Sequence, residues 1–161
     1  MDYRNVDNLK IENAHIMFRN FSGKASQYNK EGSRNFCVRI EDPEVAQRLK
    51  DIGWNIRILA ARNQDEEATH YLPVSISFDN YPANVILHKN GVATKLTGET
   101  IGMLDFAEIK NIDLIVRPYQ WEVRNDNGIK AYVKTMHVTL EEDPFEAKYA
   151  SEESPSEDIP W

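Results

Sequence analysis

Arginine, tyrosine and tryptophan alternate at Arg117, Tyr119 and Trp121, within the stretch RPYQWEV. Successive side chains of a β-strand point to opposite faces, so these three are predicted to share one face, with the apolar Leu114 and Val116 on the other. Aromatic rings stack on unpaired bases, at roughly 1–3 kcal/mol per base, and arginine pairs with phosphates. The pattern favours contact with a single-stranded nucleic acid. The alternative is that the two rings cover a second small core.

The same mixture of bases and aromatic rings recurs in a glycine-broken loop, FRNFSGKASQYNKEGSRNF, and in the stretch GIKAYVK. Basic residues interleaved with rings are typical of a groove that follows a nucleic-acid backbone. The alternative is a solvated hairpin loop, with Phe18 and Phe36 in the core. We expect Phe36 and Trp54 to be core residues. The further candidate contacts are Arg19, Phe21, Lys24, Tyr28, Arg34, Lys130, Tyr132 and Lys134.

Residues that catalysis requires are sparse in this sequence. The four histidines are scattered without metal-ligand spacing, and Cys37 is the single cysteine, expected to be buried in a strand. Neither a glycine-rich phosphate loop nor a Gly-x-Ser-x-Gly elbow is present. The acidic loop DEEATH, residues 65–70, leaves a metal-dependent nuclease as an alternative, although a solvated loop is the simpler interpretation. We predict a protein that is not an enzyme and has no metal or cofactor.

The elements that must position the candidate contacts are mainly strands. Alternating and apolar patterns predict strands over 9–21, 34–40, 55–62, 71–78, 111–123 and 131–140, and a hairpin over 84–96. Turns are expected at Asn90-Gly91 and Asn127-Gly128. One helix is predicted over 43–52, ending at Gly53, and a second over 97–110. The order fits a mainly β OB-fold, a five-stranded barrel with inserted hairpins and two short helices.

The net charge of −7 is concentrated at one end of the chain. Residues 141–161 hold eight acidic residues and one basic residue, which gives −7, so residues 1–140 are neutral overall. The prolines and acids there predict a disordered acidic tail, residues 141–161, after a nucleic-acid-binding domain, residues 1–140. The sequence has no apolar run of about 20 residues and no secretory signal pattern, so we expect a cytoplasmic protein.

The tail ends on Asp158, Ile159, Pro160 and Trp161. A large apolar side chain at a terminus gains nothing in water, so these four residues are predicted to dock into a pocket of another protein. The ending resembles the C-terminal tip of bacterial single-stranded DNA-binding proteins, which is Asp-Ile-Pro-Phe. The body is similar to phage-encoded single-stranded DNA-binding proteins, on the stretches FRNFSGKASQYNKEGSRNFCVRI and YLPVSISFDNYP.

This resemblance implies an OB-fold that binds single strands without sequence preference during replication, recombination or repair, in the cytoplasm of a bacterial host. It also implies that the tip recruits replication and recombination proteins, and it leaves a homo-oligomer open. The alternative is a protein–protein adaptor without DNA affinity. We expect the anionic tail to compete with DNA as a tethered ligand, so that removing residues 142–161 tightens binding at low salt.

Overall fold

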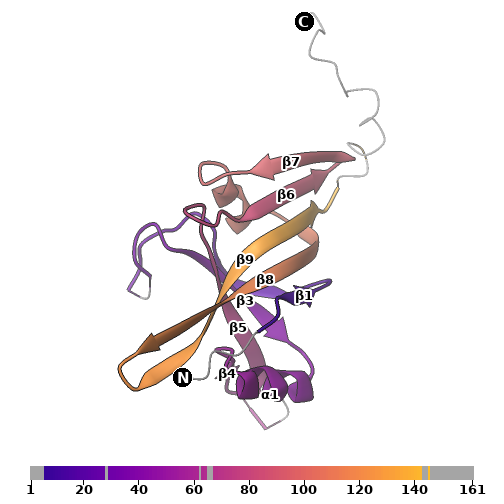
Figure 1. Ribbon diagram of the computed structural model, residues 1–161. Coiled ribbons are helices and arrows are strands. Elements are labelled where there is room, and N and C mark those ends of the chain that lie inside the picture. Colours follow the sequence, from indigo (N-terminus) through magenta and orange to yellow (C-terminus); the bar gives the residue numbers. More distant parts are fainter. Residues whose placement is uncertain (1–5, 28, 62, 65–66, 143–144, 146–161) are drawn as a thin grey trace, which may run out of the picture.

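Strands account for half of the residues that the computed structural model describes, which are 6–27, 29–61, 63–64, 67–142 and 145 (Figure 1). Its helical elements are α1 (Pro43–Ile52) and the short 3-10 helix η1 (Ile101–Asp105). The strands are β1 (Leu9–Ile11), β2 (Ile16–Asn20), β3 (Arg34–Ile40), β4 (Arg57–Leu59), β5 (Thr69–Ile76), β6 (Asn84–Lys89), β7 (Val92–Leu96), β8 (Ile109–Val123) and β9 (Asp126–Leu140). Neither helix is long and apolar enough to cross a membrane, within the described residues.

The strands form one sheet in the order β1-β8-β9-β5-β3-β2. Strand β9 is its hub, because it pairs antiparallel with β8 and parallel with both β5 and β6. Strand β4 pairs with β5, and β7 pairs with β6. No pairing joins β2 back to β1 in the described part of the chain, so the sheet is open. The predicted mainly β class is confirmed, but the barrel is not closed by hydrogen bonds.

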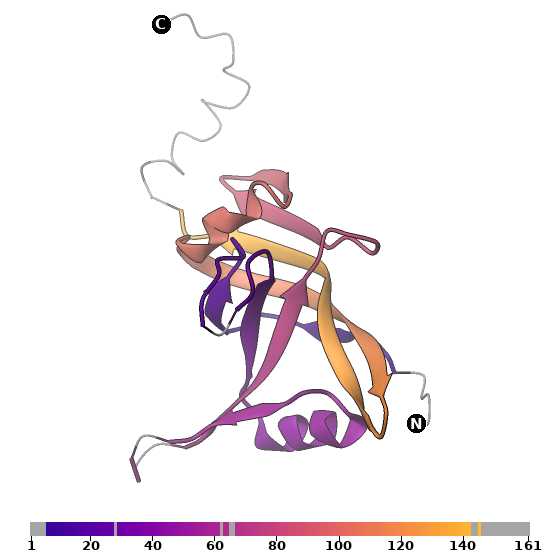
Figure 2. The same cartoon turned by 90° about the vertical axis from the view of Figure 1, so that its left-hand side faces the viewer.

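The inward face of this sheet forms the core, and the predicted alternation of residues 34–40 is confirmed there. Phe36 and Val38 are fully buried, and Trp54 lies in the same core. Other fully buried core side chains are Phe21, Leu72, Ile101, Leu104, Ile112, Val116, Met136 and Val138. Figure 2 shows α1 at the lower end of the sheet, beside the tip of the β8–β9 hairpin.

The first predicted helix is confirmed, because Asp42 Oδ1 accepts a hydrogen bond from the amide of Glu44 (2.9 Å) and Gly53 ends the helix at φ 126°. The second predicted helix, over 97–110, is wrong beyond one turn. The observed 3-10 helix η1 ends at Asp105, whose carboxylate accepts hydrogen bonds from the amides of Phe21 (2.6 Å) and Ser22 (3.1 Å). This tie fixes the end of η1 against the end of β2, and β8 begins four residues later.

Two strand boundaries differ from the sequence prediction. The expected strand 9–21 is divided into β1 and β2 by a turn in which Asn13 has φ 49°, a conformation that asparagine tolerates. The β8–β9 turn is at Arg124-Asn125 instead of Asn127-Gly128, since Val123 pairs with Asp126. Gly128 is therefore a strand residue. The predicted hairpin turn at Asn90-Gly91 is confirmed, with φ 52° and 76°.

The start of the predicted acidic tail contacts the body. The amide of Glu141 donates to the carbonyl of Glu108 (2.8 Å), and Glu142 Oε1 accepts a hydrogen bond from the amide of Asn90 (2.9 Å). The remainder of the tail, including the predicted docking tip, lies outside the described residues apart from Phe145.

Candidate nucleic-acid interface

The outward face of the β8–β9 hairpin carries the residues with which the sequence analysis began. Register places Arg117 opposite Tyr132, Tyr119 opposite Lys130 and Trp121 opposite Gly128. Directly opposed residues of an antiparallel pair lie on the same face. The shared face predicted for Arg117, Tyr119 and Trp121 is thus present, and two further candidates from β9 join it.

Tyr132 is at the centre of a compact group, which we call the β8–β9 cluster: Tyr81, Arg117, Tyr119, Lys130 and Tyr132. The rings of Tyr119 and Tyr132 meet edge to face, with centroids 6.2 Å apart. The Arg117 guanidinium lies 5.2 Å from the centroid of Tyr132 and 5.1 Å from that of Tyr81, and Lys130 Nζ lies 5.1 Å from Tyr132. Cations held over rings in this way stabilise the arrangement by roughly 0.5–1 kcal/mol each at exposed sites.

The cluster presents open ring surface to solvent. Tyr81 is 74% exposed and Tyr119 is 53% exposed. Both rings line an open hollow of about 630 Å³ together with Arg117 and Tyr132, and Asp79 is the one acidic residue in its lining. Exposed rings beside fixed positive charges are what stacking on bases and pairing with phosphates require.

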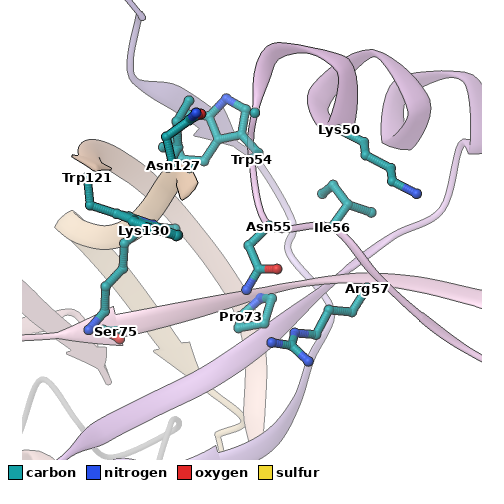
Figure 3. A pocket seen from close by; sticks show the side chains of 14 residues that line it. Lys50, Trp54, Asn55, Ile56, Arg57, Pro73, Ser75, Trp121, Asn127 and Lys130 are labelled. Atoms are coloured by element: carbon teal, nitrogen blue, oxygen red, sulfur yellow. The ribbon is translucent and has the colours of Figure 1, made fainter. Parts of the chain in front are cut away.

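A second hollow, the basic groove, adjoins the cluster through Lys130 (Figure 3). Its volume is about 470 Å³. Fourteen residues line it; three of them, Lys50, Arg57 and Lys130, are basic and none is acidic. Trp121 and the nearly buried Trp54 are its aromatic residues, and the side chains of Lys130 and Arg57 lie on either side of Pro73 in Figure 3. The lining is therefore suited to an anionic, unpaired strand.

Backbone pairing between β9 and the segment that follows α1 brings together residues of this groove. The carbonyl of Gly53, at the end of α1, accepts a hydrogen bond from the amide of Ile129 (3.2 Å), and Trp54 forms a bridge to the same residue. This contact places the chain after α1 alongside the backbone of β9. A Cβ atom at Gly128 would lie 3.0 Å from Trp121 Cζ2, so glycine allows the indole to lie close over the backbone of β9.

The candidates in the N-terminal loop have different environments. Phe21 is a correction: it is fully buried, with its ring stacked on Phe36 at 5.3 Å, and so it is a core residue instead of a ligand contact. Arg19 Nη1 donates to the carbonyls of Leu104 (3.1 Å) and Ala107 (2.8 Å). These bonds give Arg19 a role in joining β2 to η1.

Arg34 and Lys24 also contact the protein itself. Arg34 Nη2 donates to the carbonyl of Gly98 (2.8 Å), and its guanidinium lies 5.9 Å from the ring of Phe78. Lys24 Nζ lies 5.5 Å from the ring of Phe106. Tyr28 is outside the described residues, and Lys134 falls in a bulge of β9, between the residues paired with Ile115 and Val116. Arg34, Lys24 and Lys134 do not belong to the β8–β9 cluster.

Tyr81, Lys50 and Arg57 were not predicted as site residues. Tyr81 comes from the loop between β5 and β6, and the two bases flank the end of α1. No alternation marks such positions, because the fold alone brings them to β9. The sequence features that could have indicated these residues are a tyrosine in a turn-rich stretch and two basic residues near the end of a helix.

The other potential chemistry of the sequence is limited. Cys37 is half-buried, less than predicted, and this burial raises the pKa of its thiol to about 11 against the opposing effect of the Arg57 charge. His88 and His137, scattered in sequence, meet across β6 and β9 with Nε2 and Nδ1 2.9 Å apart. No group of three or more potential metal ligands occurs among the described residues, although Asp65 and Glu66 of the acidic loop fall outside them.

Comparison with known proteins gives a family and a fold. The family model described as phage ssDNA-binding domain matches residues 1–160. The single-stranded DNA-binding protein from bacteriophage Enc34 has a similar structure, with a TM-score of 0.53 and 11% identity, covering 86% of this chain and 83% of that chain. The same phage protein in complex with ssDNA gives 0.52 and 11%, covering 86% and 89%. No curated protein matches the sequence.

Proposed function

The chain belongs to the family of phage single-stranded-DNA-binding domains, and from this premise we propose that it coats single-stranded DNA without sequence preference and without catalysing a reaction. The observation that carries the proposal is the continuity of the β8–β9 cluster with the acid-free basic groove. The phage Enc34 proteins of similar structure are single-stranded DNA-binding proteins, which supports an OB-like fold in this role.

The chemistry of this surface favours a single strand over a duplex. Bases of a single strand are free to stack on Tyr81, Tyr119 and Trp121, whereas duplex bases present only their edges. Arg117 and the three groove bases supply the cations for the phosphates. Ring faces accept any base, so binding of this kind carries no sequence code.

The proposal extends to the setting in which the chain works. Coating of single strands belongs to replication, recombination or repair, here in the cytoplasm of a bacterial host. We assign recruitment of partner proteins to Asp158, Ile159, Pro160 and Trp161, on the chemistry of an aromatic ending behind an acidic segment. The negative tail would keep the basic groove free of weak anions and yield to DNA.

Tryptophan fluorescence tests the proposed interface directly, because Trp121 lines the groove and Trp54, which also borders it, is only 2% exposed. Trp161→Phe removes the third indole while keeping an aromatic tip. Titration of this variant with oligo-dT should quench the emission strongly, and duplex DNA should quench it weakly. Adding Trp121→Phe should abolish the quench while leaving the melting temperature nearly unchanged.

Two outcomes would contradict the proposal. An unchanged spectrum with oligo-dT, poly-rA and duplex DNA would remove nucleic acid as the ligand and favour an adaptor. A quench that survives Trp121→Phe would come from Trp54, the other indole of the groove lining, and would refute stacking of a base on Trp121.

A further inference from the structure

Phe18 occupies a backbone conformation that its side chain disfavours. Its φ is 54°, in the left-handed region, where a bulky residue other than glycine is a genuine outlier. Its side chain is 58% exposed, although the flanking strand residues Ile16 and Asn20 pair regularly with β3. Strain at an exposed aromatic residue costs on the order of 1–3 kcal/mol and is concentrated at functional sites.

A bulge in β2 is the cause of this conformation. Met17 pairs with Cys37 and Asn20 pairs with Asn35, so Phe18 and Arg19 together oppose Phe36 alone. The hydrogen bonds of Arg19 to the carbonyls near η1 hold the strand on the other side. Bulges of this kind re-aim a side chain. Here the bulge keeps Phe18 out of the core and places its ring against Tyr71, edge to face, with centroids 6.0 Å apart.

Tyr71 connects Phe18 to the interface already described. It pairs with Arg57 of β4 on one side and with Arg39 of β3 on the other. Arg57 lines the basic groove, so the Phe18–Tyr71 pair lies at the groove end away from the β8–β9 cluster. Arg39 also borders a hollow with Glu41 and Glu67, which leaves Arg57 as the cation best placed for a phosphate.

We propose that Phe18, supported by Tyr71, is a second stacking platform, which takes a base of the same single strand that the β8–β9 cluster binds. The inference rests on the proposed function and extends it. From β8 to β2 the sheet order has four strand spacings, about 19 Å in total. A single strand of DNA must therefore cross β9, β5 and β3 to reach both platforms. Arg57 is on this route.

Oligonucleotide length separates the two platforms. We would measure binding of oligo-dT of about 4 and about 16 nucleotides, the range of one OB fold. Phe18→Gly removes the ring and relieves the positive φ, whereas Phe18→Tyr keeps a stacking surface. With the longer oligonucleotide, Phe18→Gly should lose about 5- to 150-fold in affinity, the equivalent of about 1–3 kcal/mol for one stacked base. With the shorter one, bound at the β8–β9 cluster, it should lose almost nothing.

Three controls complete the experiment. Phe18→Tyr should retain wild-type affinity for both lengths. Val92→Ala, at a similarly exposed apolar side chain (54%) on β7, should change neither. Tyr119→Ala should weaken both. The melting temperature of Phe18→Gly should equal or exceed that of the wild type, because glycine adopts positive φ without strain.

The outcomes distinguish this inference from the proposed function. If Phe18→Gly binds the longer oligonucleotide as the wild type does while Tyr119→Ala weakens both lengths, the second platform is refuted and the proposed function stands. A lower melting temperature with equal losses at both lengths would make Phe18 a structural residue and refute the inference as well. If the wild type binds neither length, the proposed function fails and the inference fails with it.

Discussion

The salt dependence of binding offers the sharpest quantitative test of the interface. Four cations face the proposed path of the strand: Lys50, Arg57 and Lys130 in the basic groove, and Arg117 in the β8–β9 cluster. Each phosphate neutralised on a single strand contributes about −0.7 to the slope of log K against log salt. Four contacts predict a slope of about −2.8, so affinity should fall about 50-fold between roughly 50 and 200 mM salt.

Single substitutions show how much each cation contributes to this slope. Lys130→Gln and Arg57→Gln should each make it shallower, to about −2.1. Tyr119→Ala should lower affinity by about 1–3 kcal/mol and leave the slope unchanged, because stacking releases no counterions. Fluorescence titration with oligo-dT at several salt concentrations measures both quantities. The acidic tail affects all variants alike, so the differences between variants carry the test.

Lys95→Gln is the matched control, since Lys95 is an exposed base on β7 outside both hollows. It should leave affinity and slope as they are. The reasoning is refuted if the wild-type slope is near zero, or if Lys95→Gln changes the slope as much as Lys130→Gln does. In the second case binding would depend on overall charge and would require no defined groove.

Three further predictions follow from single contacts. Gly128→Ala puts a Cβ atom 3.0 Å from Trp121, so it should displace the indole, alter its emission maximum and weaken oligo-dT binding, with a stability loss of about 1 kcal/mol in thermal melts. Burial alone would raise the pKa of Asp105, but hydrogen bonds from Ser22 and Phe21 and the charge of Lys24 lower it from 3.8. The ionised Asp105 carboxylate therefore stabilises the fold at pH values above 3.8, and this stabilisation is lost as the pH falls through the lowered pKa. Denaturant melts should show Asp105→Asn to be less stable than the wild type by about 1 kcal/mol at pH 7, and this difference should vanish in acid. Truncation after Glu142, which keeps its bond to Asn90, should tighten oligo-dT binding at low salt and have no effect at high salt.

Local patterns predicted the elements that are built from local interactions. The alternation of residues 34–40, the caps of α1 and the Asn90-Gly91 turn all depend on neighbours in sequence, and all are confirmed. The shared face of Arg117, Tyr119 and Trp121 follows from strand parity alone. Their grouping with Lys130 and Tyr132 needed only the hairpin.

Errors arose where a distant contact outweighed the local signal. Gly128 suggested a turn, but its lack of a Cβ serves the indole of Trp121. Phe21 is in a basic, polar loop by sequence, yet it is buried on Phe36 because Asp105 holds its amide. Arg57 reaches the interface only through β4 and β5 pairing. These contacts range from the Trp121–Gly128 pair of one hairpin to the Phe21–Asp105 bond between residues 84 positions apart, and each depends on strand pairing that a local pattern does not reveal.

The central position of β9 in the sheet determines when the other strands can pair during translation. Strands β5, β6 and β8 all need β9, the last strand of the body, as a partner, so they leave the ribosome before the strand that joins them. Until Leu140 has emerged, β5 and β6 present unpaired edges, which are prone to aggregate. We therefore expect folding of the body to wait until β9 has left the ribosome. A nascent chain stalled before residue 126 should remain sensitive to protease, whereas one released just beyond residue 142 should not.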